Sequence, residues 1–464
     1  MPPLVRNQEL DLTIDSLAYG GRGVARYDDL VVFVARALPG DRVRARVTKF
    51  KKRYAEALAV ELLEPGPGRV TARCSHFGVC GGCAWQDLEY GEQLKHKQAQ
   101  VVDALERLGH LDGFALEPIE PAREIWAYRN KFEYSWLQAG RGASLGFHVA
   151  GRWDRLMAVE KCHIASEPSN RLRQAFERWA RELDLRAYDQ RSGEGFLRHL
   201  VVREGRRTGQ LLALLVTAPG EVPGIGRLAE LLCVGQAPPD GWGVVGVVHA
   251  VNDGVAEISS GLPTRTLIGA DEFEEQVLGL SLRLSSGAFM QTNSEMCDVL
   301  YGLALEYAEL RPDDVAWDLY CGAGAIGLLA APHVRRVVGV EISPESIARA
   351  RDNASRNGVS NAEFVQGDVA KQVRPLLERV ERPTVAFVDP PRAGLTPRAV
   401  RRLIELAPQR IVYVSCNPTT LAPNARQLVD AGFELERVRP VDMFPHTHHI
   451  ECVTRFRRLA ESTV

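Results

Sequence analysis

The sequence predicts an α/β fold for the C-terminal part of the chain, behind a small N-terminal β-barrel and a mixed α+β centre. Three patterns carry this prediction. Apolar β-rich runs alternate with helical segments from about residue 275 onward, short β-rich runs fill residues 1–64, and the chain between them mixes both patterns. We therefore expect three domains, at residues 1–65, 66–275 and 276–464.

The bulk composition is that of a soluble globular protein. Of the 464 residues, 45% are hydrophobic and 25% are charged, and the net charge of −2 gives no global basic field that would attract nucleic acid. No apolar run approaches the length of a membrane span, and residues 1–9 lack the pattern of a signal peptide. We expect a cytoplasmic protein without a membrane partner, and no feature indicates an obligate protein partner.

Residues 1–64 have the pattern of a small β-barrel, with turn residues such as Gly20–Gly21 and Pro39–Asp41 between the strands. The expected strands are Leu10–Ile14, Leu30–Val34, Arg42–Val47 and Glu56–Leu62.

The segment Arg42–Arg53 carries seven basic residues and no acid. Its first three arginines alternate with apolar residues, which on a strand puts the charges on one face and the apolar side chains in the core. Phe50 and Tyr54 are placed to stack on bases, and small barrels hold single-stranded nucleic acid by such a mixture of basic and aromatic residues. The alternative is a charged edge strand that deters aggregation.

A cysteine-rich stretch follows a linker at Pro65–Gly68. Clustered cysteines in a cytoplasmic chain indicate metal ligands or catalysts rather than disulfides. Four thiolates suit either a [4Fe–4S] cluster or structural zinc, and because His76 or His163 can replace one of them, the spacing alone does not decide. The four cysteines in this pattern are Cys74, Cys80, Cys83 and Cys162.

The centre begins with an amphipathic helix expected at Tyr90–Leu108, and strand-like runs follow at Lys131–Trp136, Leu197–Val202 and Gln210–Val216. A second group of basic residues accompanies the last two runs, and it indicates either a second nucleic-acid surface or an exposed hairpin. Its members are Arg198, His199, Arg203, Arg206 and Arg207.

The C-terminal part alternates strands and helices, which means βαβ units and a parallel sheet. Helices are expected at segments such as Pro344–Asn357 and Pro397–Leu406. The expected strands are Val315–Leu319, Val337–Val340, Ala362–Val365, Val385–Val388 and Ile411–Val414.

A glycine-rich loop, Asp318–Ala325, follows the first of these strands and opens a helix. Gly322 and Gly324 let the backbone approach a ligand closely at the helix N-terminus. Glu341 ends the next strand, where a carboxylate accepts hydrogen bonds from the hydroxyls of an adenosine ribose. The loop lacks the third glycine of a nicotinamide site, and it resembles the loop of S-adenosylmethionine (SAM)-dependent methyltransferases. The alternative is an ordinary tight turn.

Three further motifs are expected to meet at the sheet edge where open α/β folds place their sites. They are Asp389–Arg392, Ser415–Pro418 and Pro445–Glu451. Cys416 puts a thiol at the end of a strand that a proline stops, whereas an ordinary strand cysteine is a small buried hydrophobe. The histidines of the third motif are expected to shape the site or lie on the surface rather than bind metal.

In combination, these motifs resemble the RNA uridine-5-methyltransferase family over nearly the whole chain. The resemblance points to its 23S ribosomal RNA branch, which has an N-terminal TRAM domain with an OB-like barrel, a central domain with an iron–sulfur cluster, and a Rossmann-like SAM-dependent domain. The family often has Asn in place of Ala325, so one side-chain contact is lost here. The resemblance rests on Phe289–Asn293, Asp318–Gly324, Asp389–Gly394, Ser415–Pro418 and His449–Glu451.

Methylation of uracil at carbon 5 explains why these residue types occur together. Carbon 5 is a poor nucleophile until a thiolate adds to carbon 6, and a base must later remove the carbon 5 proton. Cys416 fits the nucleophile and Glu451 the base, while Asp389 holds the substrate or the cofactor. The target base must be flipped out of its stack to react.

The resemblance also implies the ligand sets. The four cysteines would hold a [4Fe–4S] cluster, and the RNA partner would be 23S rRNA, with transfer RNA as the alternative. The residues implied to line the SAM and target-base pocket are Gln291, Tyr320, Glu341, Asp368 and Asp389.

Three competing interpretations use only part of this pattern. Enzymes that methylate exocyclic amines of adenine share Asp-Pro-Pro but need an aromatic residue where Arg392 stands. DNA cytosine-5 enzymes usually place their cysteine after the fourth strand, whereas Cys416 follows the fifth. A non-catalytic RNA-binding iron–sulfur protein leaves Cys416 and Glu451 without a role.

Overall fold

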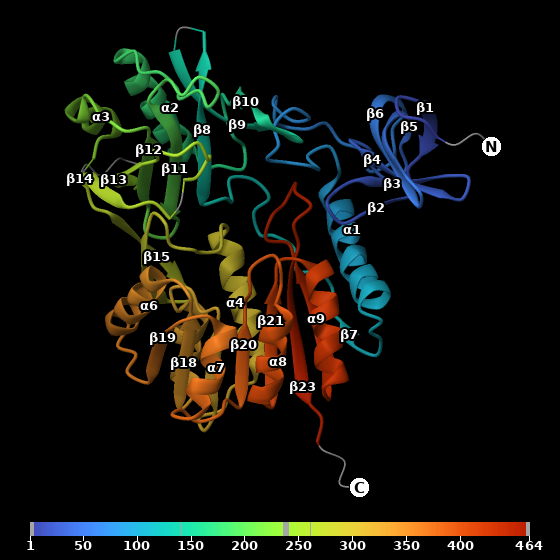
Figure 1. The fold of residues 1–464 in the computed structure, drawn as a ribbon, viewed down its shortest axis with the longest axis vertical. Coiled ribbons are helices and arrows are strands. Elements are labelled where there is room, and N and C mark those ends of the chain that lie inside the picture. The colour runs from blue at the N-terminus through green and yellow to red at the C-terminus, as the bar shows by residue number, and fades with distance from the viewer. Residues whose placement is uncertain (1–3, 141, 235–240, 260, 461–464) are drawn as a thin grey trace.

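A computed structural model describes residues 4–140, 142–234, 241–259 and 261–460. Each of the three predicted domain ranges therefore includes a few residues that lie outside the described part. Figure 1 shows three regions: the N-terminal barrel in blue, a green sheet at the centre of the chain, and a C-terminal α/β layer in orange and red. Among the described residues, no helix is both long enough and apolar enough to cross a membrane.

The N-terminal region is a six-stranded sheet with the strand order β1-β5-β6-β4-β3-β2, which confirms the expected β-rich region. Val43, Ala45 and Val47 are buried in its core, as the alternation along the basic segment predicted. Two strands were not predicted from the sequence, the short β2 and β3. The strands are β1 (Glu9–Thr13), β2 (Ser16–Leu17), β3 (Gly23–Tyr27), β4 (Leu30–Ala35), β5 (Arg42–Lys51) and β6 (Tyr54–Glu64).

The basic strand β5 lies between β1 and β6, so the alternative of a charged edge strand is wrong. Its arginines are also ion-paired, because acids on the neighbouring strands face them. Arg46 contacts Glu9 at 2.8 Å, and Lys49 contacts Glu56 at 3.3 Å. Further pairs join Arg42 to Glu64, and Arg44 to both Asp11 and Glu61. The exposed basic residues at the β5–β6 turn are Lys51, Lys52 and Arg53.

The predicted helix at 90–108 is confirmed as α1 (Tyr90–Asp103), which continues as a short π-helix, η1 (Ala104–Leu108). The central sheet has the order β10-β9-β8-β11-β12-β13-β14, with two helices beside it. The predicted central strands are confirmed as β8, β11 and β12. The elements are β8 (Lys131–Ala139), β9 (Gly142–Val149), β10 (Arg152–Ala158), α2 (Glu167–Glu182), β11 (Leu197–Gly205), β12 (Gln210–Thr217), α3 (Ile225–Leu232), β13 (Gly243–Val251) and β14 (Thr264–Gly269).

The second basic group lies on the β11–β12 hairpin, and three of its five members are buried, so the group does not form one continuous nucleic-acid surface. Arg198 and Arg203 are 5% and 2% exposed, and both donate hydrogen bonds to backbone carbonyls. His199 is buried as well. Arg206 pairs with Glu204, and Arg207 pairs with Asp298. Arg198 and Arg203 thus attach loops to the sheet, because buried carbonyl oxygens need hydrogen-bond donors.

The C-terminal sheet has the order β19-β18-β17-β20-β21-β23-β22-β7, and the predicted alternation of strands and helices is confirmed. Strands β17 to β21 are parallel, β23 is antiparallel to β21, and β7 (Ala115–Leu116) adds an edge from the centre of the chain. The strands are β17 (Val315–Leu319), β18 (Arg336–Glu341), β19 (Ala362–Gln366), β20 (Val385–Val388), β21 (Arg410–Ser415), β22 (Phe433–Val441) and β23 (Glu451–Arg458).

Both faces of this sheet are covered, which is why its strands are continuous apolar runs. In β17, Trp317 enters the apolar cluster on one face and Ala316 the cluster on the other. A hairpin of β15 (Glu272–Val277) and β16 (Leu280–Ser285) precedes the sheet. The helices are α4 (Ser294–Ala308), α5 (Ala325–Ala330), α6 (Pro344–Arg356), α7 (Val369–Leu377), α8 (Pro397–Leu406) and α9 (Pro418–Asp430), with a 3₁₀ turn, η2 (Ala331–His333), after α5.

Candidate active site

The strand order reverses between β17 and β20, and the two carboxyl ends form the crevice where open α/β sheets bind ligands. The glycine-rich loop lies at this point. Tyr320, Gly322 and Gly324 all have positive φ, and a Cβ atom added at Gly324 would lie 3.1 Å from Phe364. A Cβ atom at Gly322 would meet open space instead. The loop backbone thus turns sharply and leaves room beside Gly322 for a ligand.

Glu341 is tied to this loop. Its carboxylate accepts hydrogen bonds from the N–H of Gly322 at 3.2 Å and of Ser343 at 2.9 Å. Burial, together with the negative charges of Asp368 and Glu341, raises the pKa of Tyr320 to about 12. Three of the predicted cofactor residues therefore lie near one another at the ends of β17, β18 and β19.

Two acids lie at the carboxyl ends of β17 and β20. Asp318 is 1% exposed and accepts a hydrogen bond from the N–H of Gly327 at 2.8 Å. Burial raises the pKa of Asp318 to about 7. Burial also raises the pKa of Asp389 to about 7, and the charge of Asp318 adds to that shift. Carboxyl groups whose pKa values are raised in this way cluster at functional sites.

Cys416 lies between β21 and α9, where Asn417 caps the helix by accepting a hydrogen bond from the N–H of Thr419. The thiol is half-buried. Burial raises the pKa of Cys416 to about 12, and the charges of Glu451 and Asp389 add to the increase. Arg392 acts in the opposite direction. The predicted nucleophile thus shares one site with two acids and one arginine.

Glu451 is the first residue of β23 and is 3% exposed. Burial raises its pKa well above the ordinary value, and the charge of Asp389 raises it further, whereas Arg392 lowers it. The guanidinium of Arg392 lies 2.6 Å from Nδ1 of His449. The predicted base is therefore a buried acid on the same pocket as the Cys416 thiol.

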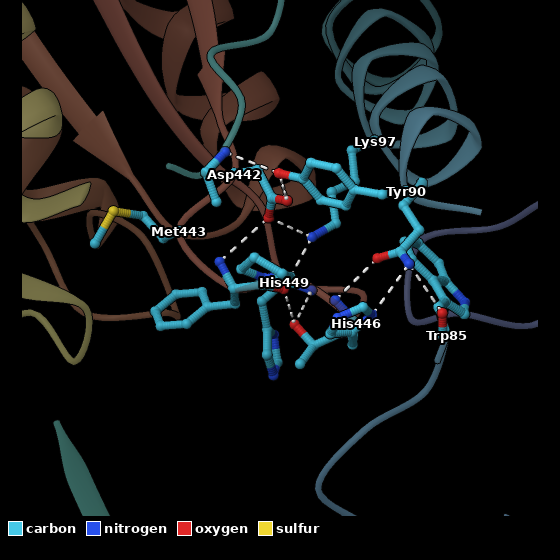
Figure 2. A network of polar contacts seen from close by, with 12 residues as sticks. Trp85, Tyr90, Lys97, Asp442, Met443, His446 and His449 are labelled. Atoms are coloured by element: carbon cyan, nitrogen blue, oxygen red, sulfur yellow. Dashed lines mark hydrogen bonds and ion pairs between the residues drawn. The ribbon is translucent and has the colours of Figure 1, made fainter. Parts of the chain in front are cut away.

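The segment 442–450 joins β22 to Glu451, and we call it the catalytic loop. Figure 2 shows how α1 holds it: Lys97 and Asp442 form an ion pair at 2.6 Å, and both side chains are fully buried. Lys97 also donates to the carbonyl of Phe444, and the hydroxyl of Tyr90 donates to Asp442 at 2.9 Å. Burial lowers the pKa of Lys97, while Asp442 favours its charged form.

The motif Phe289–Asn293 fixes the other side of this loop. The side chain of Asn293 donates to the carbonyl of Met443 at 3.0 Å. Gln291 is 5% exposed, and its carbonyl accepts a hydrogen bond from the side chain of Asn130 at 3.1 Å. The motif therefore joins the central sheet to the catalytic loop.

The four clustered cysteines surround a separate cavity of about 440 Å³. His449 of the catalytic loop also lines it. Burial raises the pKa of Cys83 to about 12 and of Cys162 to about 11, and nearby thiols add to both increases. Nε2 of His76 accepts the N–H of Glu160 at 3.1 Å, which ties this ring to the backbone. Within the described ranges, no group of three or more Cys, His, Asp or Glu side chains is arranged to hold a metal ion.

The backbone after the first three cysteines is hydrogen-bonded to the catalytic loop. The N–H groups of Ala84 and Trp85 both donate to the carbonyl of His446, at 2.8 and 3.0 Å. His446 also stacks on Trp126, with the ring centroids 4.0 Å apart. The predicted site-shaping role for His446 fits these contacts, because the residue joins the cysteine loop to the segment that ends at Glu451.

Comparison with known proteins gives two family matches. Residues 272–458 match the tRNA (Uracil-5-)-methyltransferase family, and residues 3–60 match the TRAM domain. An RNA methyltransferase of Halalkalibacterium halodurans is 38% identical over 451 residues, which cover 97% of each chain. A second, from Caldanaerobacter subterraneus, is 36% identical over 97% of this chain and 99% of its own. The chain belongs to the RNA methyltransferase family.

A solved structure resembles the methyltransferase over almost its whole length. It is the Pyrococcus abyssi tRNA (uracil-54, C5)-methyltransferase in complex with S-adenosyl-L-homocysteine. The TM-score is 0.75 and the identity 26%, over 96% of this chain and 100% of the other. The predicted family and enzyme class are confirmed, as are the TRAM domain and the mixed α/β fold. The roles of the individual site residues stay predictions.

Several residues of the site were missed by sequence reasoning. Arg392 served only as an argument against another enzyme class, although it lies beside both Cys416 and Glu451. Lys97 and Asp442 were missed because a buried ion pair between positions 345 residues apart leaves no local pattern. A signal for Asp318 was present, since an acid inside a buried strand needs a partner or a raised pKa.

Proposed function

We propose that this methyltransferase transfers a methyl group from SAM to carbon 5 of a uridine in RNA, with Cys416 as nucleophile and Glu451 as base. One observation carries the proposal: Ser415 pairs with Cys452 across β21 and β23, so Cys416 and Glu451 are neighbours of one paired position, and Asp389 and Arg392 act on the pKa of both. A thiol and a carboxyl group on one pocket are what addition at carbon 6 and proton removal at carbon 5 require.

The glycine-rich loop supports SAM as the methyl donor. The open space at Gly322 would take the amino acid part of the donor, and Glu341 would accept hydrogen bonds from the ribose hydroxyls. Tyr320, Asp368 and Gln291 would complete the pocket. When bound, SAM supplies an electrophilic methyl group. The Pyrococcus abyssi structure contains S-adenosyl-L-homocysteine, the product of such a donor.

The mechanism assigns one task to each protein side chain. Cys416 loses its proton to water, and the thiolate adds to carbon 6 of the flipped uracil, which makes carbon 5 nucleophilic. Asp389 holds the ring by a hydrogen bond. After carbon 5 has gained the methyl group, Glu451 removes its proton, and the bond between Cys416 and carbon 6 breaks. Arg392 favours the thiolate, because it is the nearby cation.

We propose a uridine of 23S rRNA as the target. The barrel and the four cysteines support this proposal through the resemblance to the ribosomal branch. Transfer RNA is a second candidate, because the structural neighbour named for transfer RNA matches this chain over 96% of its length. A barrel in this position therefore does not by itself separate the two substrates.

The four cysteines are proposed to hold a [4Fe–4S] cluster. All four line one cavity beside the catalytic loop, and a metal cluster would stabilise the thiolates of Cys83 and Cys162, whose charged forms this site otherwise disfavours. The cluster would act as a structural staple. We further propose that 1–65, 66–275 and 276–464 fold as the barrel, the cluster-containing domain and the catalytic domain.

The deciding experiment incubates the purified protein with SAM and RNA and analyses the nucleosides. We expect 5-methyluridine in 23S rRNA transcribed without modifications, and less or none in transfer RNA. Product in transfer RNA alone would correct the target but keep the chemistry. If neither RNA yields 5-methyluridine, the proposed function is wrong.

A further inference from the structure

A turn of the N-terminal barrel reaches the catalytic centre. This turn, Ala18–Arg22, joins β2 to β3 and is closed by two backbone hydrogen bonds. Gly20 and Gly21 take positive φ angles of 94° and 82°, which glycine adopts without strain. The side chain of Gln100 in α1 donates to the carbonyl of Leu17 at 3.2 Å. The turn is therefore held in one conformation against α1.

The same turn touches the catalytic loop. A Cβ atom added at Gly21 would lie 3.3 Å from the Cβ of His448, so the two backbones approach closely. Tyr19, at the tip, packs against the apolar cluster that contains Ile450 and Cys452. In Figure 1, β2 and the start of α1 lie beside the red loop that rises from β23.

Tyr19 brings a polar group to this contact. Arg392, Cys416 and Glu451 all act electrostatically on this hydroxyl and change its pKa. Burial and the charges of the two acidic groups raise the pKa of Tyr19, so the phenol stays protonated at neutral pH and remains a donor. Arg392 is the cation that acts on the Cys416 thiol, and Tyr19 adds a neutral hydroxyl donor to the same pocket.

We propose that Tyr19 forms a wall of the target-base pocket and donates a hydrogen bond from its hydroxyl to a carbonyl oxygen of the uracil. This proposal rests on the proposed function. When the sulfur of Cys416 bonds to carbon 6, electron density moves through carbon 5 onto the carbonyl oxygen at carbon 4. A neutral donor aimed at that oxygen stabilises the charge as it develops. The barrel is then part of the active site as well as an RNA-binding module.

The test compares Tyr19→Phe with Tyr27→Phe in the full-length protein. Tyr27 is the matched control, because it packs against the barrel core and the same hydroxyl is removed. We measure the affinity for RNA and the single-turnover rate of 5-methyluridine formation at saturating RNA and SAM. Y19F is expected to slow this rate about 100-fold, as the loss of one donor to a developing oxyanion does. RNA affinity and the thermal midpoint should stay near the wild-type values, and Y27F should match wild type throughout.

A second measurement follows the covalent adduct between Cys416 and RNA that contains 5-fluorouridine. Y19F is expected to form this adduct as slowly as it forms product. A wild-type rate for Y19F would overturn the inference while leaving the proposed function intact. So would a variant that binds RNA weakly but reacts at the normal rate once saturated, since Tyr19 would then be an ordinary RNA contact. No 5-methyluridine with the wild-type protein would instead remove the proposed function itself.

Discussion

Two acids and one cation act on the Cys416 thiol, and together with burial they set its protonation state. With a pKa of about 12, the thiol is protonated at neutral pH before substrate binds. The proposed mechanism needs a thiolate, so the proton has to leave before the sulfur adds to the ring. Burial also raises the pKa of Glu451, so Glu451 must lose its own proton before it can act as the proposed base.

Replacing Cys416 and replacing Glu451 should stop the reaction at two different steps. Cys416→Ala should abolish methyl transfer and keep SAM binding, since the thiol is not part of the glycine-rich loop. Glu451→Gln should stall the enzyme with RNA attached through Cys416, because the carbon 5 proton stays in place. Denaturing gels detect the adduct, and equilibrium binding measures SAM. Turnover by C416A, or clean turnover by E451Q, would contradict the corresponding role.

Arg392 should set the pH dependence of the reaction. It lowers the pKa of both Cys416 and Glu451, so Arg392→Ala should raise both. Less of each group is then deprotonated at a given pH, and the rising limb of the pH–rate profile should move up by about one pH unit. Arg392→Lys keeps the charge and should reverse much of the shift, while Arg398→Ala, which replaces an exposed residue of α8, should leave the profile unchanged. An unmoved profile for R392A would rule out this electrostatic role.

At the scale of elements, the catalytic loop depends on one buried ion pair from α1. Lys97→Met leaves the fully buried Asp442 without its cation, which should lower the free energy of unfolding by about 3–5 kcal/mol. The same change should slow methyl transfer, because the loop positions Glu451. Urea unfolding and single-turnover assays measure the two effects.

Lys95→Met is the matched control on the same helix. The side chain of Lys95 is 72% exposed in its pair with Glu92, and its loss should cost about 0–1 kcal/mol. Equal costs for K97M and K95M would show that the buried pair does not hold the loop.

The barrel strand β5 makes a second prediction at this scale. Its arginines face acids of β1 and β6, so the exposed turn Lys51–Arg53 should carry the contacts to phosphate. The triple alanine variant of this turn should reduce the slope of log Kd against log salt by about 2. Removing Arg46 together with its partner Glu9 conserves the net charge and should leave the slope near that of wild type. If the Arg46–Glu9 double variant instead reduced the slope more than the triple variant did, the RNA-binding surface would lie on the face of β5.

At the scale of the whole molecule, the cysteine loop and the catalytic loop share hydrogen bonds at His446. Cys83→Ser should remove iron, sulfide and visible absorption, lower the thermal midpoint and slow methyl transfer. Cys233→Ser is the control, because Cys233 is exposed and lies far from the cavity residues in sequence. Full iron content in C83S would remove Cys83 as a ligand, and zinc in place of iron in the wild-type protein would reject the cluster.

The sequence predicted the parallel strands to within about one residue because they are buried on both faces, as the run Val385–Val388 shows. It did not predict β22 and β23, whose charged residues interrupt the apolar pattern. The three motifs of the site were recognisable because each follows a strand or a loop with special turn residues. Lys97 and Tyr19 were not, since their meaning comes from contacts with segments hundreds of residues away. Local patterns report local geometry, and only the fold reports the partners.

The position of β23 has a consequence for folding during synthesis. This strand is synthesised after β22, yet it pairs with both β21 and β22 and lies between them. A nascent chain that ends before β23 already contains Cys416, but the sheet is open at the place where Glu451 belongs. At that stage of synthesis the chain contains the proposed nucleophile but not the proposed base. Under the proposed mechanism, the enzyme can turn over only after β23 has inserted between β21 and β22.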